Sequence, residues 1–211
     1  MNRLPFWLKI SFTLWVLLWI PFYWGYYGPQ NFLWFCDIGN IAIVAALWLE
    51  SRFLFSWQAV SLLLVQILFT IDISGRAIFG VHPIGGSEYM FNATIPLGIR
   101  LLSIFHIVTP PLLVWALLRL GYDRRALLVQ AMTNMIVLPI SWLFGPDNDI
   151  NWVWGLFDKP QSVFTPLIWL AVCMAGYPLF LYLPSHLVLT AIMPLWQKKR
   201  ETAHVDSHLQ N

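Results

Sequence analysis

FLFSWQAVSLLLVQILFTI, from Phe53 to Ile71, is an uninterrupted run of residues without a single charged side chain. Its length is close to the roughly 20 residues that an α-helix needs to cross the hydrocarbon core of a bilayer. Lipid offers no partners for backbone N–H and C=O groups, so such a run is stable there only when a helix satisfies those groups internally. The stretch therefore predicts an integral membrane protein built from α-helices.

The composition of the whole chain agrees with this prediction. Of the 211 residues, 59% are hydrophobic and 10% are charged, whereas a soluble domain carries roughly 25% charged residues. We predict an all-α, polytopic membrane bundle of six transmembrane helices. The helices are expected at Phe6–Tyr26, Gln30–Leu49, Phe53–Ile71, Leu97–Leu120, Ala126–Gly145 and within Val163–Trp196. Pro184 interrupts the last run, which forms either one long kinked helix or a span followed by an interfacial segment.

Basic residues predict the orientation of the six helices, because Lys and Arg collect on the cytoplasmic side. With six spans both termini share a side, which also holds the connections at 50–52 and 121–125. Only Arg76, Arg100 and Lys159 fall on the opposite side. The cytoplasmic set is Arg3, Lys9, Arg52, Arg119, Arg124, Arg125, Lys198, Lys199 and Arg200. We therefore expect cytoplasmic termini, with the long connections 72–96 and 146–162 on the outer face.

The domain organisation and the partners follow from the same features. Residues 1–200 are expected to form a single membrane domain, followed by a polar, disordered tail at 201–211. A net charge of +2 does not predict nucleic-acid binding, and we expect membrane lipid and a lipid or small-molecule substrate as partners.

Cys36 and Cys173 both lie in apolar runs, so two separate thiols are expected in place of a disulfide. No cofactor or metal is expected.

Polar residues within the predicted spans are the candidates for a functional site, since such residues usually face a bundle interior or a wet cavity. In the second helix, Cys36 and Asn40 share one helical face, as do Asp37 and Asn40. At a rise of 1.5 Å per residue, Cys36 and His106 lie at comparable depths below the outer ends of their helices. The supporting polar candidates are Asp37, Asn40, Asp72, Arg100, Ser103, Asn134 and Asn151.

A thiol and an imidazole in one cavity form a possible nucleophile and base for acyl transfer. We therefore assign Cys36 as candidate nucleophile and His106 as candidate base, with Asp37 or Asn134 orienting the imidazole and Arg100 or an Asn amide stabilising an oxyanion. Three alternatives remain open. Asp37 can form a structural ion pair with Arg100 or Arg76, Cys36 can be an apolar filler, and Asp37, Asp72 and His106 can hold a metal for hydrolysis. The last ranks lower because no HxxxH or HExxH spacing occurs. His82 is expected to be exposed.

Several motifs follow one another along the chain: the segment 32–37 ending in Cys36-Asp37, the acidic Asp72, Ser103-Ile104-Phe105-His106, the basic turn 121–125, and Asn151-Trp152-Val153-Trp154 before Lys159-Pro160. Their order resembles the YwaF-like bacterial integral membrane family. Together they cover roughly residues 30–185. The chain departs from the family pattern at Trp34, where the family has His, and in a longer spacer before Lys159-Pro160.

The resemblance implies a location in the bacterial inner membrane. That family is in turn distantly similar to androgen-induced membrane lipid hydrolases and to a transmembrane ether-lipid acyltransferase. By this resemblance, Cys36 and His106 are the catalytic pair of a membrane-embedded lipid acyl hydrolase or acyltransferase that opens to the outer face.

Two other functions remain open. In the first, Asp37, Arg100 and His106 bind or transport a small polar solute or a lipid head group without catalysis. In the second, the chain is a structural membrane subunit that has no functional site.

Overall fold

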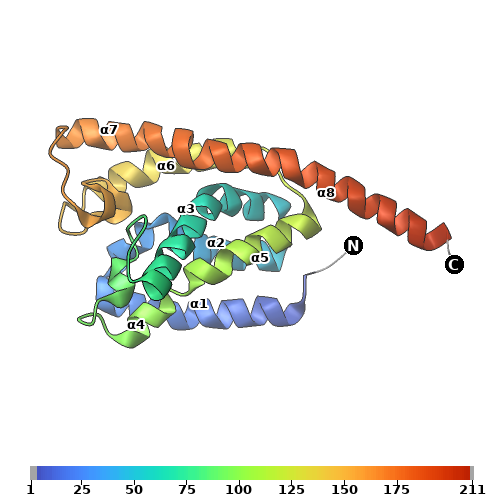
Figure 1. Ribbon diagram of the computed structural model, residues 1–211, viewed down its shortest axis with the longest axis horizontal. Helices are drawn as coiled ribbons and strands as arrows, with labels where there is room; N and C mark the ends of the chain where they lie inside the picture. Colours follow the sequence, from blue (N-terminus) through green and yellow to red (C-terminus); the bar gives the residue numbers. More distant parts are fainter. Residues whose placement is uncertain (1–3, 210–211) are drawn as a thin grey trace.

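A computed structural model describes the backbone of residues 4–209 and the side chains of residues 4–157 and 159–198. The protein is all-helical, with 78% of its residues in helices and no strand in the described part of the chain (Figure 1). Its α-helices are α1 (Phe6–Tyr27), α2 (Phe35–Leu49), α3 (Arg52–Phe79), α4 (Leu97–Leu102), α5 (Phe105–Leu120), α6 (Ala126–Trp142), α7 (Pro166–Tyr177) and α8 (Leu183–Leu209). The shorter turns are η1 (Pro29–Leu33), η2 (Glu88–Phe91), η3 (Ile150–Trp152), η4 (Leu156–Asp158) and the π-helical η5 (Pro178–Tyr182).

Helices long and apolar enough to cross a membrane are present, as the sequence predicts. Four segments meet that description: Phe6–Tyr27, Arg52–Phe79, Leu97–Leu120 and Pro166–Lys198. The other two predicted spans correspond to the shorter apolar helices α2 and α6. Large apolar side chains cover the outside of the bundle, for example Leu14 and Leu17 on α1, which are 61% and 62% exposed. So much apolar surface is unusual on a soluble monomer and suits contact with lipid.

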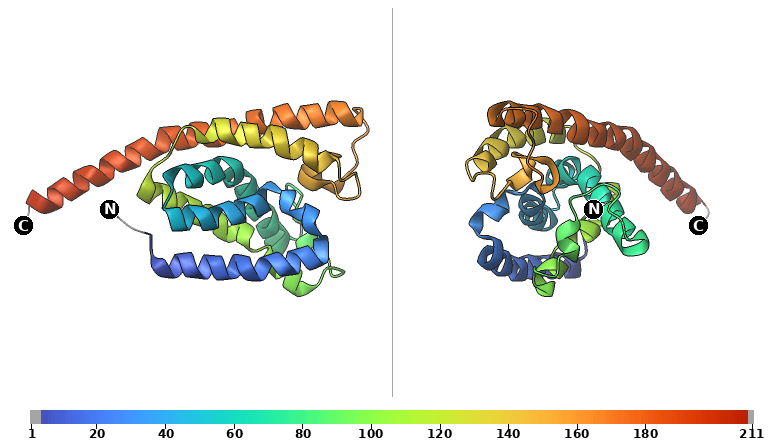
Figure 2. Two further views of the ribbon diagram at one scale, coloured as in Figure 1. Left: turned by 180° about the vertical axis from the view of Figure 1, so that it is seen from behind. Right: turned by 60° about the vertical axis from the view of Figure 1, so that its left-hand side comes forward.

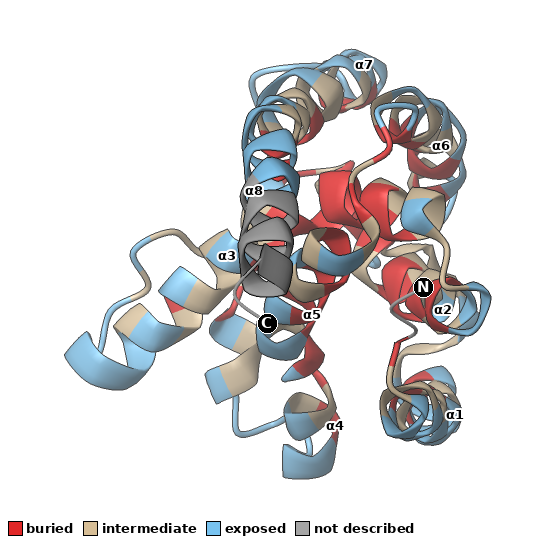
Figure 3. Cartoon of the chain, turned by 90° about the vertical axis from the view of Figure 1, so that its right-hand side faces the viewer, coloured by how far each residue is buried: buried red, intermediate tan, exposed pale blue. Residues whose placement is uncertain are grey.

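Helix α3 forms the centre of the bundle. It packs against α2, α5 and α6, while α1 and the α7–α8 segment lie on opposite sides of the molecule (Figures 1 and 2). An end-on view shows that the buried residues gather between these two sides (Figure 3). Gly39 of α2 lies so close to Leu62 that any added Cβ would collide with the leucine side chain. A glycine at this position therefore allows α2 and α3 to approach closely.

The first described residues and the connections at 50–51 and 121–125 lie at one end of the bundle. Lys9 donates to Glu50 at 2.7 Å, and an Arg52 nitrogen lies 3.9 Å from an Asp123 oxygen. Gly121 is close to the side chain of Gln197 in α8. Arg3 and the side chains of Lys199, Arg200 and the tail 201–211, which entered the sequence predictions, lie outside the described residues. The backbone of α8 is helical as far as Leu209, across most of the predicted tail.

Two predicted helices have different boundaries in the structure. Helix α3 continues from the predicted end at Ile71 to Phe79, where Gly80 ends it in the left-handed conformation (φ 76°). The predicted helix Leu97–Leu120 is divided into α4 and α5. At the division, Ser103 N–H donates to the carbonyl of Arg100, three residues earlier, at 3.0 Å. The N–H of the next residue likewise donates to the carbonyl three residues before it. These tight turns bend the chain in the middle of a predicted span.

The final apolar run forms one continuous helical segment, in which α7, η5 and α8 follow without a break. Its irregular turn begins at Pro178 and not at Pro184, where the sequence predicts the interruption. Pro178 has no N–H to donate to the carbonyl of Met174, four residues earlier. Asn134 of α6 donates to that carbonyl at 3.0 Å. A side chain from a neighbouring helix thus replaces the hydrogen bond that proline removes.

Candidate functional site

Polar side chains from five segments meet where α2 begins. These segments are the last turns of α1, η1, the start of α2, the α4–α5 junction and η2. Asp37, in the first turn of α2, is 2% exposed. Its carboxylate accepts a hydrogen bond from Asn31 Nδ2 at 2.6 Å and one from Cys36 Sγ at 3.7 Å. Both partners are electrically neutral, so no charge within the described residues balances an ionised Asp37.

The structural ion pair considered for Asp37 does not form. Among the described side chains, the salt bridges involve Glu50, Asp123 and Asp72 as the acidic partners, and none involves Asp37. Arg100 instead donates to the carbonyl of Met90 at 3.0 Å. Arg76 donates to the carbonyl of Gly80, within its own helix end. The interpretation of Asp37 as one half of an ion pair with Arg100 or Arg76 was therefore wrong.

Tyrosine hydroxyl groups connect the Asp37 region to the α4–α5 junction. The hydroxyl of Tyr23 is hydrogen-bonded to that of Ser103. Tyr89 of η2 also interacts with Ser103, and both tyrosines lie within electrostatic range of Cys36. Asp37 also lies within electrostatic range of Tyr23 and Tyr27. These tyrosines are not among the candidates predicted from the sequence, although Tyr23 and Tyr27 stand four residues apart on the inner face of the first helix.

His106 lies at the far side of this cluster, with its ring stacked between two phenylalanines. The ring centroids of Phe69 and Phe105 are 4.5 and 4.0 Å from that of His106. The Nδ1 atom is 2.8 Å from the carbonyl oxygen of Ser103. A carbonyl only accepts, so Nδ1 carries the proton and donates, which leaves Nε2 as the unprotonated nitrogen of the neutral ring.

The structure does not join Cys36 and His106 directly. Cys36 donates to Asp37, and His106 bonds only to Ser103, in the part of the chain that the structure describes. Ser103 links the two regions, because its carbonyl accepts from His106 while its hydroxyl contacts Tyr23. The catalytic pairing of Cys36 with His106 therefore stays a prediction. The two cysteines are free thiols, as expected.

Asn151 serves the architecture of this region. Its Oδ1 accepts from the backbone N–H of Phe35 at 3.1 Å, and its Nδ2 donates to the carbonyl of Leu33 at 2.9 Å. The first N–H groups of a helix have no partner within the helix, so Asn151 caps α2 from another part of the chain. The Tyr177 hydroxyl donates to the carbonyl of Asn151 at 2.6 Å. Asn151 thereby positions Cys36 and Asp37 indirectly.

Asn134 and Asn40 differ in their surroundings. Asn134 uses both ends of its amide, donating to Met174 and accepting from the Tyr182 hydroxyl at 3.2 Å. It therefore supports the α6–α7 contact, and it makes no hydrogen bond to His106. Asn40 is fully buried, yet neither polar atom of its side chain has a partner among the described residues.

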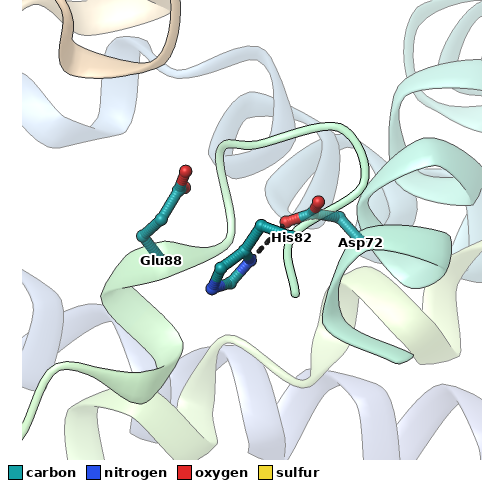
Figure 4. Close-up of side chains that lie close together, drawn as sticks. All are labelled: Asp72, His82 and Glu88. Atoms are coloured by element: carbon teal, nitrogen blue, oxygen red, sulfur yellow. Dashed lines mark hydrogen bonds and ion pairs between the residues drawn. The ribbon is translucent and has the colours of Figure 1, made fainter. Parts of the chain in front are cut away.

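Asp72 anchors the loop that follows α3. Its Oδ1 accepts from the backbone N–H groups of Ile84 and Gly85, both at 2.8 Å, and its Oδ2 contacts His82 Nδ1 at 2.9 Å and the Ser87 hydroxyl. Figure 4 shows the His82 ring turned toward Asp72. His82 was expected to be exposed, but its side chain is only 19% exposed.

A metal site built from Asp37, Asp72 and His106 receives no support from this arrangement. Potential ligand atoms of Asp72, His82 and Glu88 lie within 4.8 Å of one another. The Asp72 oxygens, however, already accept hydrogen bonds from the loop, and Glu88 accepts from Gly86 N–H at 2.6 Å. Asp72 therefore stabilises the loop, and it forms no cluster with Asp37 or His106 among the described residues.

The chain was compared with known proteins at three levels. Family models, curated proteins and solved structures all return no match, so no family is assigned and the resemblance noted in the sequence stays a hypothesis.

Proposed function

We propose that this membrane protein binds the cationic head group of a lipid, or a small polar cation, at Asp37. One observation supports the proposal above the others. The Asp37 carboxylate is 2% exposed and its hydrogen-bond partners, Asn31 and Cys36, are both neutral. An ionised carboxylate inside a membrane costs several kcal/mol unless a positive charge balances it. A cationic ligand supplies that charge.

The rings near Asp37 favour a cation for a second reason. Tyr23 and Tyr27 both lie within electrostatic range of the Asp37 carboxylate, and their ring centroids are 5.2 Å apart. The face of an aromatic ring attracts a cation, especially an ammonium or quaternary ammonium group removed from water. A carboxylate in the same region as two tyrosine rings is therefore suited to ethanolamine-like or choline-like groups.

Thermal unfolding of the purified protein with added choline or ethanolamine tests this function. A ligand at about 100 times its Kd stabilises the folded state by about 2.7 kcal/mol, which a rise in Tm reports. The rise should persist in Cys36→Ala and disappear in Asp37→Asn, which keeps the shape of the side chain but removes its charge. Equal shifts in both variants, or no shift with either compound, would refute cation binding at Asp37.

The proposed topology has six spans with both termini in the cytoplasm. Its support is the presence of four long apolar helices and two shorter ones, α2 and α6, together with the concentration of Lys and Arg near the termini and the 121–125 turn. Alkaline phosphatase fused within residues 80–86 should be active outside the cell. The same enzyme fused within 121–125 should be inactive, and the opposite pattern would reverse the orientation.

Acyl transfer is a second candidate function, favoured by the tautomer of His106. The unprotonated Nε2 is available to take the proton of a thiol, here that of Cys36. The thiolate would then attack an ester carbonyl, and the alcohol would leave with the proton from the imidazolium. Water, or a second alcohol, would release the acyl group from the thioester and restore the thiol.

Turnover of a lipid ester separates this second function from simple binding. Cys36→Ala and His106→Ala should each abolish turnover and labelling by a fluorophosphonate-type probe, while the Tm shift with choline remains in Cys36→Ala. Full activity in both variants would eliminate the acyl-transfer function and leave cation binding intact.

A further inference from the structure

Gln66 of α3 and Thr109 of α5 are fully buried polar residues whose side chains have no hydrogen-bond partner among the described residues. Both are 0% exposed. Neither the Gln66 amide nitrogen, nor its oxygen, nor the Thr109 hydroxyl makes a hydrogen bond among the described residues. A buried polar group without a partner costs about 1–3 kcal/mol. Three such atoms need a physical explanation.

Thr109 differs from three other helical threonines of this chain. Thr13, Thr70 and Thr133 each donate to the carbonyl four residues earlier, at 2.7–2.8 Å. That local bond is the ordinary way for a threonine to satisfy its hydroxyl inside a membrane helix. The Thr109 hydroxyl does not make it. Its hydroxyl is therefore available to another partner.

The packing of α3 on α5 brings Gln66 and Thr109 to the same depth. The rings of Phe69 on α3 and His106 on α5 stack at 4.5 Å. Gln66 comes three residues before Phe69, and Thr109 comes three residues after His106, so each lies one turn away on the same face of its helix. Because the two helices run in opposite directions, both steps lead toward the same layer of the bundle.

The backbone contributes further acceptors at this layer. Pro110 and Pro111 lie inside α5. Because proline has no N–H, the carbonyl groups of His106 and Ile107 lose the donors that would normally lie four residues later. The Gln66 amide, the Thr109 hydroxyl and these carbonyls thus offer both donors and acceptors, and none of them carries a charge.

Helix α2 places Cys36 near the same layer. Gly39 of α2 faces Leu62 of α3. Cys36 lies one turn from Gly39, and Gln66 lies one turn from Leu62, in the same direction along the bundle. Gln66 therefore lies at the depth of Cys36 and within one turn of the depth of His106.

We infer that Gln66 and Thr109 form a second binding site, at the depth of Cys36, for an uncharged hydroxyl group. A hydroxyl both donates and accepts, so it satisfies the Gln66 oxygen, which an ester or ketone cannot do. A water molecule and the hydroxyl of an alcohol-bearing lipid share this chemistry. The site does not depend on cation binding at Asp37, because no charged group takes part.

Thermal unfolding without added ligand tests the site through substitutions that preserve side-chain shape. In a dry core, Thr109→Val and Gln66→Met remove unpartnered polar atoms and should raise Tm. With a bound hydroxyl they remove hydrogen bonds and should lower Tm by about 2–6 °C. Thr190→Val is the matched control, because the Thr190 hydroxyl in α8 is also unpartnered but lies elsewhere. It should leave Tm unchanged or higher.

The source of the hydroxyl is identified by repeating the measurement in two environments. One is lauryldimethylamine oxide, a detergent without hydroxyl groups, and the other is a phosphatidylglycerol nanodisc. An equal loss of Tm in both identifies water, and a loss only in the nanodisc identifies the lipid hydroxyl. If Thr109→Val and Gln66→Met behave like Thr190→Val in both environments, the site is refuted. Neither result affects the rise in Tm that choline is expected to produce by binding at Asp37.

Discussion

The side-chain oxygen of Asn151 accepts a hydrogen bond from the backbone N–H of Phe35 at 3.1 Å, although 116 positions separate the two residues. Asn151 has positive φ (56°) within η3. That conformation is tolerated by asparagine better than by most residues. Through this bond the loop after α6 fixes the start of α2, and with it the positions of Cys36 and Asp37.

Removing this cap should destabilise the protein. Asn151→Ala removes the acceptor for Phe35 and the donor to Leu33, and the loss of a helix cap costs about 0.5–2 kcal/mol. Denaturant or thermal unfolding should show a decrease of that size or more. Asn148→Ala in the same loop is the control, because its bond to Gln30 is exposed. Equal stability of the two variants would contradict the capping role.

The contact between Asn134 and the carbonyl of Met174 predicts that a second substitution can restore stability lost when Asn134 is replaced. Asn134→Leu leaves that carbonyl without a donor and should lower stability by about 1–3 kcal/mol. Pro178→Ala supplies a backbone N–H at the position where proline lacks one, so the double variant should recover part of the loss. A double-mutant cycle of unfolding free energies measures the coupling. Additive effects would show that Asn134 and Pro178 act independently.

Asp72 should control the order of the loop that follows α3. Asp72→Asn retains one oxygen but places an N–H₂ group where His82 and Ser87 now meet the second oxygen. Backbone amides at Ile84 and Gly85 should then exchange hydrogen faster, which hydrogen–deuterium exchange mass spectrometry detects. Glu88→Gln, on the same loop, should have a smaller effect. If hydrogen exchange at these amides is unchanged in Asp72→Asn, the proposed anchoring role of Asp72 is contradicted.

The turn at 121–125 should make stability depend on pH. The hydrogen bond from the Arg125 guanidinium lowers the pKa of Asp123, which lies outside the membrane-spanning segments. A pKa lowered by folding contributes stability above the unfolded value, and that stability is lost as the pH falls through the folded value. Asp123→Asn should therefore reduce Tm at neutral pH, with a difference that shrinks in acid. A difference independent of pH would contradict this linkage.

The sequence singles out candidate residues but not the contacts that they make. Residue type and depth point to Asp37, Ser103 and His106, because ionisable and polar residues are rare in membrane helices, and their role in a functional site stays a prediction. The same reasoning assigned Asn134 and Asn151 to the site, yet their amides satisfy backbone groups exposed by Pro178 and by the start of α2. Those backbone groups become available only when distant helices pack together.

Hydropathy in the sequence alone determined that this protein is a bundle of apolar α-helices, because lipid requires every backbone polar group to be satisfied within a helix. The tertiary structure decided which polar residues meet. Gly39 against Leu62 and Phe69 against His106 define how α2, α3 and α5 align. That alignment depends on side-chain packing between helices, which no local pattern encodes. It is the reason that Gln66, missed in the sequence, lies level with Cys36.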